Sequence, residues 1–257
     1  MRHLLLLLLA ALLLMGGAAH AQTRGPVQRP PPHKPYAPVA VDIPDPPDDP
    51  SFATFRKELA DIARRRVYAD LAAVVVARGF FWDRDFAGGF DPSKTGVENL
   101  AIAIGLEAHG GSGWRRLDGF AAEPIATPAP LQTGVICGPP PPFYNENEFD
   151  RFIDTTKTAS NVWTYPRNAG GVVRAAPREG SPVVETLGQN FVHVLGYEAG
   201  DNDLQPERTA WARVATPTGK AGFVAPGTLR PLGAEQLCYA KDVTGRWRIA
   251  GYVGRGD

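Results

Sequence analysis

The stretch that decides the fold of the second half of the chain runs from Val172 to Leu229. It reads VVRAAPREGSPVVETLGQNFVHVLG from Val172 and, after an insertion, WARVATPTGKAGFVAPGTL from Trp211. Short runs rich in Val, Phe and Trp are separated by Gly and Pro, and Thr216-Pro217-Thr218-Gly219 has the composition of a turn. Such a series favours a small all-β barrel, which we place at residues 166–233.

A hydrophilic insertion separates Leu195 from Trp211. It carries four acidic residues, namely Glu198, Asp201, Asp203 and Glu207. We interpret it as a solvated loop, and an acidic partner-binding loop or a weak cation site are the alternatives. After the barrel, residues 234–257 contain two further strand-like runs, Gln236–Tyr239 and Arg246–Val253. We expect these strands to leave the barrel and return to the first domain.

Helical periodicity dominates residues 51–165. Phe52, Phe55, Leu59 and Ile62 recur at steps of three and four, which places them on one helix face. Asp49 and Pro50 supply a cap and a first-turn proline. Two further helices are expected, one over Ala69–Ala77 and one from Val97 to the break at His109-Gly110-Gly111. A third should begin after an N-cap at Ser112, and a fourth should lie around Phe149–Ile153. A strand is expected at Phe80–Trp82. The predicted class is α+β: a mostly helical α+β domain, then the small β-barrel, then a C-terminal two-strand tail.

The N-terminus has the pattern of a secretory signal peptide over residues 1–21. Arg2 and His3 precede an apolar run from Leu4 to Met15, and the segment ends in Ala19-His20-Ala21. The run is shorter than the roughly 20 residues of a membrane span. We expect cleavage between Ala21 and Gln22, a periplasmic or secreted protein, and no membrane span. Residues 22–50 contain ten prolines, so they are interpreted as a semi-stiff tether, either a disordered leader, a reach element or a proline-rich ligand.

Two cysteines, Cys137 and Cys238, are an even number in an oxidising compartment, and they are expected to pair. Two buried thiols are the alternative.

The charge is balanced, with 27 basic and 27 acidic residues, which argues against nucleic acid as a partner.

No set of residues with catalytic spacing stands out. His33, His109 and His193 are the histidines that follow the signal peptide. His33 lies in the tether, His109 is placed at a helix end, and His193 is expected to face outward because it alternates with valines. A thiolate enzyme needs a nucleophile, a base and an orienting group, and a disulfide would silence both cysteines. The sequence therefore predicts no catalytic residues, no metal site and no cofactor, although a pair of carboxylates such as Glu98 and Glu107 stays open.

The barrel segment resembles a bacterial SH3-like domain. Val173-Arg174-Ala175-Ala176-Pro177 is similar to the opening strand of that family, and Trp211-Ala212-Arg213-Val214 with Gly222-Phe223-Val224 is similar to its closing pair. The resemblance implies a module that binds cell-wall peptides or other proteins. It places a candidate binding surface at Trp211, Phe223, Arg178 and Glu179, although Trp211 and Phe223 as barrel core is the alternative.

Two hypotheses about function follow. The favoured one is a non-enzymatic envelope protein that binds a peptide, a peptidoglycan fragment or an envelope protein. The alternative is a cell-wall hydrolase in which the helical unit is catalytic and the SH3-like barrel is a targeting module.

Mass spectrometry of the secreted protein tests the export prediction. The mature chain should begin at Gln22, and alkylation without reduction should label no cysteine, because Cys137 and Cys238 are joined. A chain that begins elsewhere would contradict the signal-peptide assignment, and two labelled cysteines would contradict the disulfide.

Overall fold

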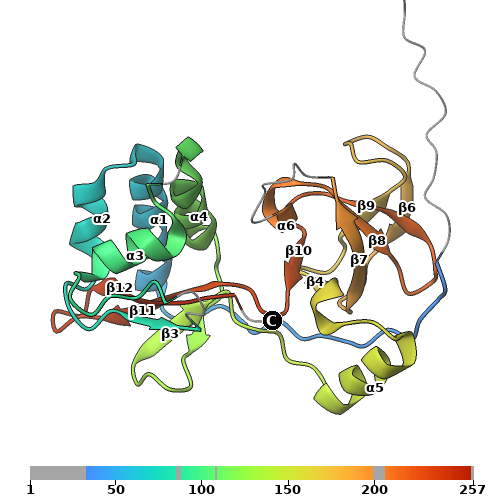
Figure 1. Ribbon diagram of the computed structural model, residues 1–257, viewed down its shortest axis with the longest axis horizontal. Coiled ribbons are helices and arrows are strands. Elements are labelled where there is room, and N and C mark those ends of the chain that lie inside the picture. The colour runs from blue at the N-terminus through green and yellow to red at the C-terminus, as the bar shows by residue number, and fades with distance from the viewer. Residues whose placement is uncertain (1–32, 85–87, 108, 199–205, 256–257) are drawn as a thin grey trace, which may run out of the picture.

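The computed structural model describes residues 33–84, 88–107, 109–198 and 206–255 of the 257. The predicted signal peptide with its cleavage site at Ala21 and Gln22, the first part of the tether, and Asp201 and Asp203 of the insertion lie outside these residues. The described chain is a mixed α+β structure with two sheets, each in its own lobe (Figure 1). Among the described residues no helix is both long and apolar enough to cross a membrane.

Four helices cover one face of the first sheet. They are α1 (Pro50–Arg65), α2 (Tyr68–Val74), α3 (Gly96–Ile104) and α4 (Ser112–Ala121), with a short 3-10 turn at His109–Gly111. The side chain of Asp49 caps α1 by accepting a hydrogen bond from Ser51 N at 2.9 Å. The predicted apolar face of α1, with Phe52, Phe55 and Leu59, is buried.

Two helix ends differ from the prediction. Helix α3 stops at Gly105 and not at the His109–Gly111 break, because Gly105 adopts the left-handed conformation that ends a helix (φ 63°). The N-cap of α4 is Gly111, without a side-chain hydrogen bond, and Ser112 is the first helical residue.

The first sheet has the order β1-β12-β11-β3-β2. Strand β1 (Phe81–Asp83) runs parallel to β12 (Trp247–Val253), and the pairs formed by β12, β11 (Gln236–Lys241), β3 (Val135–Gly138) and β2 (Thr127–Pro128) are antiparallel. The two C-terminal strands, which were expected to leave the barrel and return to the first domain, therefore form the centre of this sheet. The predicted disulfide is confirmed: it joins Cys137 in β3 to Cys238 in β11.

The second sheet is antiparallel throughout and has the order β10-β4-β7-β8-β9-β5-β6. Its strands are β4 (Trp163–Pro166), β5 (Val172–Arg174), β6 (Val183–Thr186), β7 (Val192–Tyr197), β8 (Ala212–Ala215), β9 (Ala221–Val224) and β10 (Leu229–Pro231). In the described residues strand pairing does not join β10 to β6, so the sheet is not a closed barrel. It is curled, however, since side chains of strands from β10 to β5 pack together in one apolar cluster.

Helix α5 (Glu146–Thr156) and β4 belong to the second lobe, although the sequence analysis assigned them to the first domain. Phe149 and Phe152 of α5 pack against Trp163 of β4 and against Phe191, and all four side chains are buried. A 3-10 turn at Ser160–Val162 connects α5 to β4, and a short helix, α6 (Pro206–Thr209), precedes β8. Aromatic contacts between α5 and the sheet thus move the lobe boundary to before α5.

The described part of the proline-rich segment is packed on the protein, and the expectation of a solvated tether is wrong for residues 33–49. Val39 and Val41 are 2% and 3% exposed. Val41 N donates to Gln189 O at 3.1 Å, and Phe191 N donates to Val39 O at 3.0 Å. The alternating valines provide an apolar edge, so the segment lies along the second lobe before it enters α1 (blue in Figure 1). We call residues 33–43 the N-terminal strap.

The interior of the curled sheet contains Val173, Leu187, Val214 and Val224, and Leu187 and Val224 are 3% and 0% exposed. Replacing Leu187 by Ala should lower the free energy of unfolding by about 2–5 kcal/mol, because burial is lost and a cavity remains. Urea unfolding of the mature protein measures this. Val183→Ala on β6 is the control, since Val183 is 59% exposed and its loss should cost less than about 0.5 kcal/mol. Equal effects of the two variants would contradict the assigned core.

Candidate functional site

The helix-free face of the first sheet carries a single row of residues that crosses all five strands. Strand register aligns Phe81 with Gly251, Gly251 with Cys238, Cys238 with Cys137, and Cys137 with Thr127. Paired residues in adjacent strands point to the same side of a sheet. The row is therefore one continuous strip, with the disulfide at its centre.

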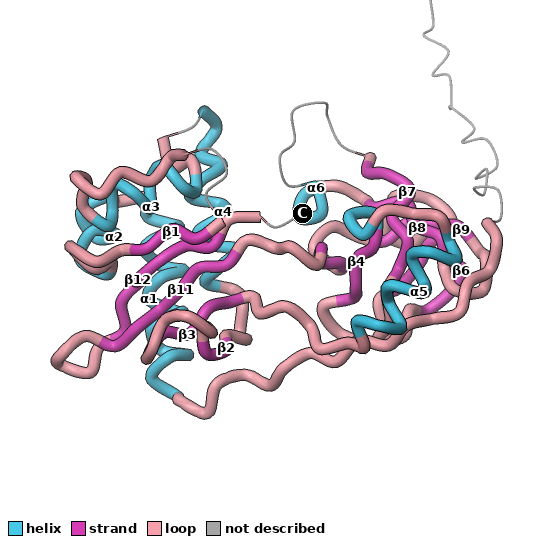
Figure 2. The backbone as a smooth tube through the Cα atoms, turned by 60° about the horizontal axis from the view of Figure 1, so that its bottom comes forward, coloured by secondary structure: helices cyan, strands magenta, loops and turns pink. Residues whose placement is uncertain are grey.

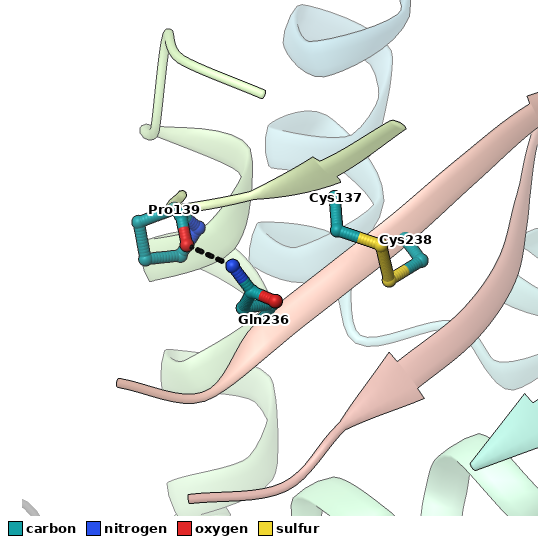
Figure 3. The surroundings of a disulfide bond; sticks show 4 residues. All are labelled: Cys137, Pro139, Gln236 and Cys238. Carbon is teal, nitrogen blue, oxygen red and sulfur yellow. Dashed lines mark hydrogen bonds between the residues drawn. A yellow bond between two sulfur atoms is a disulfide. The ribbon is translucent and has the colours of Figure 1, made fainter. Parts of the chain in front are cut away.

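The floor of this strip is apolar and flat. The disulfide and Val253 form a buried cluster, and the partly buried Phe81 packs against it. Gly251 has no side chain, and a Cβ at this position would overlap the ring of Phe81. The missing side chain therefore lets the Phe81 ring lie directly on the sheet. Figure 3 shows the disulfide between its strands, with Gln236 Nε2 donating to Pro139 O at 2.6 Å beside it.

Prolines and aromatic rings build the walls above this floor. The hairpin loop between β2 and β3 presents Leu131, which is 86% exposed, and Phe143 is 67% exposed. Together with the floor they enclose a cavity of about 890 Å³, which we call the apolar groove. Its lining also includes Trp82 and the prolines Pro44, Pro128, Pro130, Pro139, Pro140 and Pro141. Figure 2 views this lobe so that the strands that carry the groove can be followed side by side.

The groove has the features of a binding site. Binding cavities are concave, have volumes of about 300–1,000 Å³ and are lined by apolar and aromatic groups with few polar ones. Its polar side chains are sparse, with Gln132, Gln236, Asp83 and Arg84 in the lining. Apolar side chains exposed in one patch commonly mark an interaction surface.

Sequence reasoning missed this groove, although a signal for it is present. Four consecutive prolines, residues 139–142, precede Phe143 and Tyr144. Such a run is extended and cannot donate backbone hydrogen bonds, so it forms a stiff apolar wall where it meets a sheet face. The sequence did not indicate where the sheet face lies. Strands β11 and β12, from the C-terminal end of the chain, complete that face.

The surface predicted from the SH3-like resemblance lies on the second lobe. Register places Arg213 opposite Phe223, so Trp211, Arg213 and Phe223 share the sheet face opposite to the core residues Val214 and Val224. Trp211 is half-buried, whereas Phe223 is 9% exposed. Phe223 is buried on that face and offers little surface to a ligand, whereas Trp211 is partly exposed.

Arg178 and Glu179 lie in the exposed turn between β5 and β6. Glu179 pairs with Arg174 of β5 at 3.3 Å, and Arg174 is aligned with Phe223, so the structure brings this turn close to the aromatic face. The lining of the apolar groove does not include Trp211, Phe223, Arg178 or Glu179. That these residues bind a ligand stays a prediction.

Three of the residues considered for catalysis have structural roles. Cys137 and Cys238 form the disulfide, so neither provides a thiolate. Glu98 is the capping-box residue of α3 and receives hydrogen bonds from Thr95. Within the described ranges, no three His, Cys, Asp or Glu side chains are grouped as metal ligands would be. Of the acidic insertion, Glu198 is exposed and its backbone N–H donates to Trp211 O at 2.9 Å.

Two histidines that are far apart in sequence meet at the strap. His193, expected to face outward, is half-buried, and its ring stacks on Trp163 with a centroid distance of 4.7 Å. The ring of His33 lies edge-on to His193 at 6.5 Å, and His33 N donates to Gly219 O at 2.7 Å. Both rings line a cavity of about 500 Å³ between the strap, α5 and β7.

This histidine pair predicts acid sensitivity. Burial lowers the pKa of His193 in the folded protein, and the neighbouring His33 lowers it further, so the unfolded chain binds this proton more tightly. His193 therefore contributes stability above its unfolded pKa of about 6.5, and this contribution is lost as the pH falls below that value. The charged groups that face the pair from the strap and α5 are Lys34, Glu148 and Arg151.

The thermal midpoint of the mature protein, measured from about pH 8 to about pH 5, tests this expectation. His193→Phe keeps a ring on Trp163 but removes the titrating group, so its midpoint should fall less with acidification than that of the wild type. The same pH dependence in both proteins would contradict the assignment.

Comparisons with protein-family models, with curated proteins and with solved structures gave no match for this chain. The resemblance of the second lobe to SH3-like domains therefore rests on its own residues.

Proposed function

We propose that this protein is a non-enzymatic binding protein of the bacterial envelope or the secreted fraction, and that the apolar groove holds an extended peptide segment. The observation that carries the proposal is a cavity of about 890 Å³ on the helix-free sheet face, with Leu131 and Phe143 exposed at its rim. The disulfide and the signal-peptide pattern support a location outside the cytoplasm.

The shape and chemistry of the groove favour a peptide as its ligand. Grooves lined by aromatic side chains bind extended apolar and prolyl segments, because such segments are already ordered before they bind. The groove also borders β2, the edge strand of the sheet, and backbone groups at a sheet edge are available to pair with an extended chain. A partner protein or a peptide of the cell wall would present the same chemistry.

The second lobe is proposed as an SH3-like module that adds a further contact. The order of its strand motifs and the packing of its strands around one apolar cluster support this assignment. Its aromatic face, with Trp211 and Phe223 beside Arg213, has the residue types that anchor protein ligands.

Fluorescence anisotropy with a labelled, extended peptide rich in Pro and Leu tests the groove in the full mature protein. Leu131→Asp places a charge at the apolar rim and should weaken binding at least about tenfold, which corresponds to about 1.4 kcal/mol. Val243→Asp is the matched control, because Val243 is equally apolar and fully exposed but lies in the turn between β11 and β12, outside the groove lining. Both variants should fold, since surface changes of this kind alter stability little.

Two outcomes would overturn the proposal. The first is an absence of saturable binding by the wild type, and the second is an equal loss of binding in Leu131→Asp and Val243→Asp. A zymogram on purified peptidoglycan addresses the alternative function directly, since clearing by the mature wild-type protein would show a hydrolase.

A further inference from the structure

Charged residues gather where the two lobes meet. Glu123 follows α4 in the first lobe and is 5% exposed. Its Oε2 atom accepts hydrogen bonds from Arg167 at 2.7 Å and from Arg230 of β10, both of which belong to the second lobe. One buried carboxylate therefore faces two guanidinium groups.

The excess of positive charge extends along this seam. A small cavity beside Glu123 is also lined by two further positive side chains, Arg208 and Arg255, and by one further negative side chain, Glu235. The two cavities at the seam are lined by four arginines and two glutamates, and by no lysine or aspartate. This local excess stands in a chain whose 27 basic and 27 acidic residues balance. A cleft lined by one sign of charge focuses the electrostatic potential and attracts ions of the opposite sign.

The larger of these cavities is open enough to admit a ligand. It has a volume of about 510 Å³. Residues 122–125 of the first lobe form one wall, and the loops at residues 168–171 and 226–228, with Arg167 and Arg230, form the other. Gly170 and Gly227 both have positive φ, and a Cβ on either would meet no atom within 4 Å. The space beside both glycines is therefore open. The side chain of Arg167 is 33% exposed and that of Arg230 8%, so Arg167 is the group that a ligand reaches.

We propose that this cleft binds an oxyanion, the carboxylate or phosphoryl group of a small ligand, with Arg167 as the direct contact and Arg230 as the buried charge behind it. A guanidinium group donates two parallel hydrogen bonds to such an anion. Glu123 carries one negative charge and faces the two positive charges of Arg167 and Arg230. A bound anion would therefore neutralise the remaining positive charge. The site goes beyond the proposed peptide groove and does not depend on it, since the two share no residue other than Pro139 and Ala234 at the edge of the smaller cavity.

Calorimetric titration of the full mature protein with phosphate and, separately, with citrate tests the site, with chloride at matched ionic strength as the blank. Wild type should show saturable binding of at least one of the two anions, and the tighter one indicates whether phosphoryl or carboxylate groups are preferred. Arg167→Gln should weaken binding at least about tenfold, and Arg167→Lys should weaken it less because the charge remains. Arg78→Gln, which removes the same charge from an exposed position after α2, should bind like the wild type.

The variant Glu123→Gln separates an anion site from an ion cluster that only joins the lobes. In the proposed site this change removes the competing carboxylate, so affinity for the anion should rise at least about threefold, and the anion should raise the thermal midpoint more than it does in the wild type. If the cluster is only structural, Glu123→Gln lowers the midpoint and the anion restores none of the loss, which overturns the proposal. No saturable binding by the wild type, or unchanged binding by Arg167→Gln, would overturn it as well.

Discussion

The pairing of β11 with β3 is the contact on which the rest of the structure depends. It brings residues 236–241 back to residues 135–138, so the second lobe, apart from the N-terminal strap, is inserted between two neighbouring strands of the first sheet. The disulfide between Cys137 and Cys238 covalently closes this insertion over a sequence separation of 101 residues. In the chain-entropy model a loop of this length stabilises the fold by up to roughly 4.7 kcal/mol, because the unfolded chain loses freedom. The insertion also explains why the two lobes meet along a seam, since the connection after β3 and the connection before β11 start from adjacent strands.

The same pairing creates the apolar groove. Helices α1 to α4 bury one face of the sheet through Leu237, Tyr239 and Ile249, which leaves the opposite face to the disulfide and Phe81. A two-layer structure needs only one buried face on its sheet. The other face is then available, and here the proline-rich segment after β3 borders it without covering it.

The second lobe is built differently, because its sheet is curled and ends in two edge strands, β10 and β6. The strap and α5 cover one side of it with Val39, Val41, Phe149 and Phe152. These contacts use aromatic and branched side chains in place of further strands. The ring of His193 takes part in this packing through its stack on Trp163. Because His193 lies between the strap and the sheet, its protonation should affect how firmly the strap is held.

Local signals in the sequence determined most helices and strands, because an amphipathic period or a turn residue acts over a few positions. The apolar face of α1, the cap at Asp49 and the strand runs around Val173 and Val224 follow from neighbouring residues alone, and the pairing of Cys137 with Cys238 followed from their number and compartment. The sequence did not determine that Val39 and Val41 are buried, that α5 packs on the second sheet, or that a groove lies over Cys137. Those outcomes depend on which surfaces meet over long separations, through the return of β11 and β12 and the contacts of Phe191 and Trp163. Only the tertiary structure decides them, because the free energy of burial belongs to both partners of a contact and not to either segment by itself.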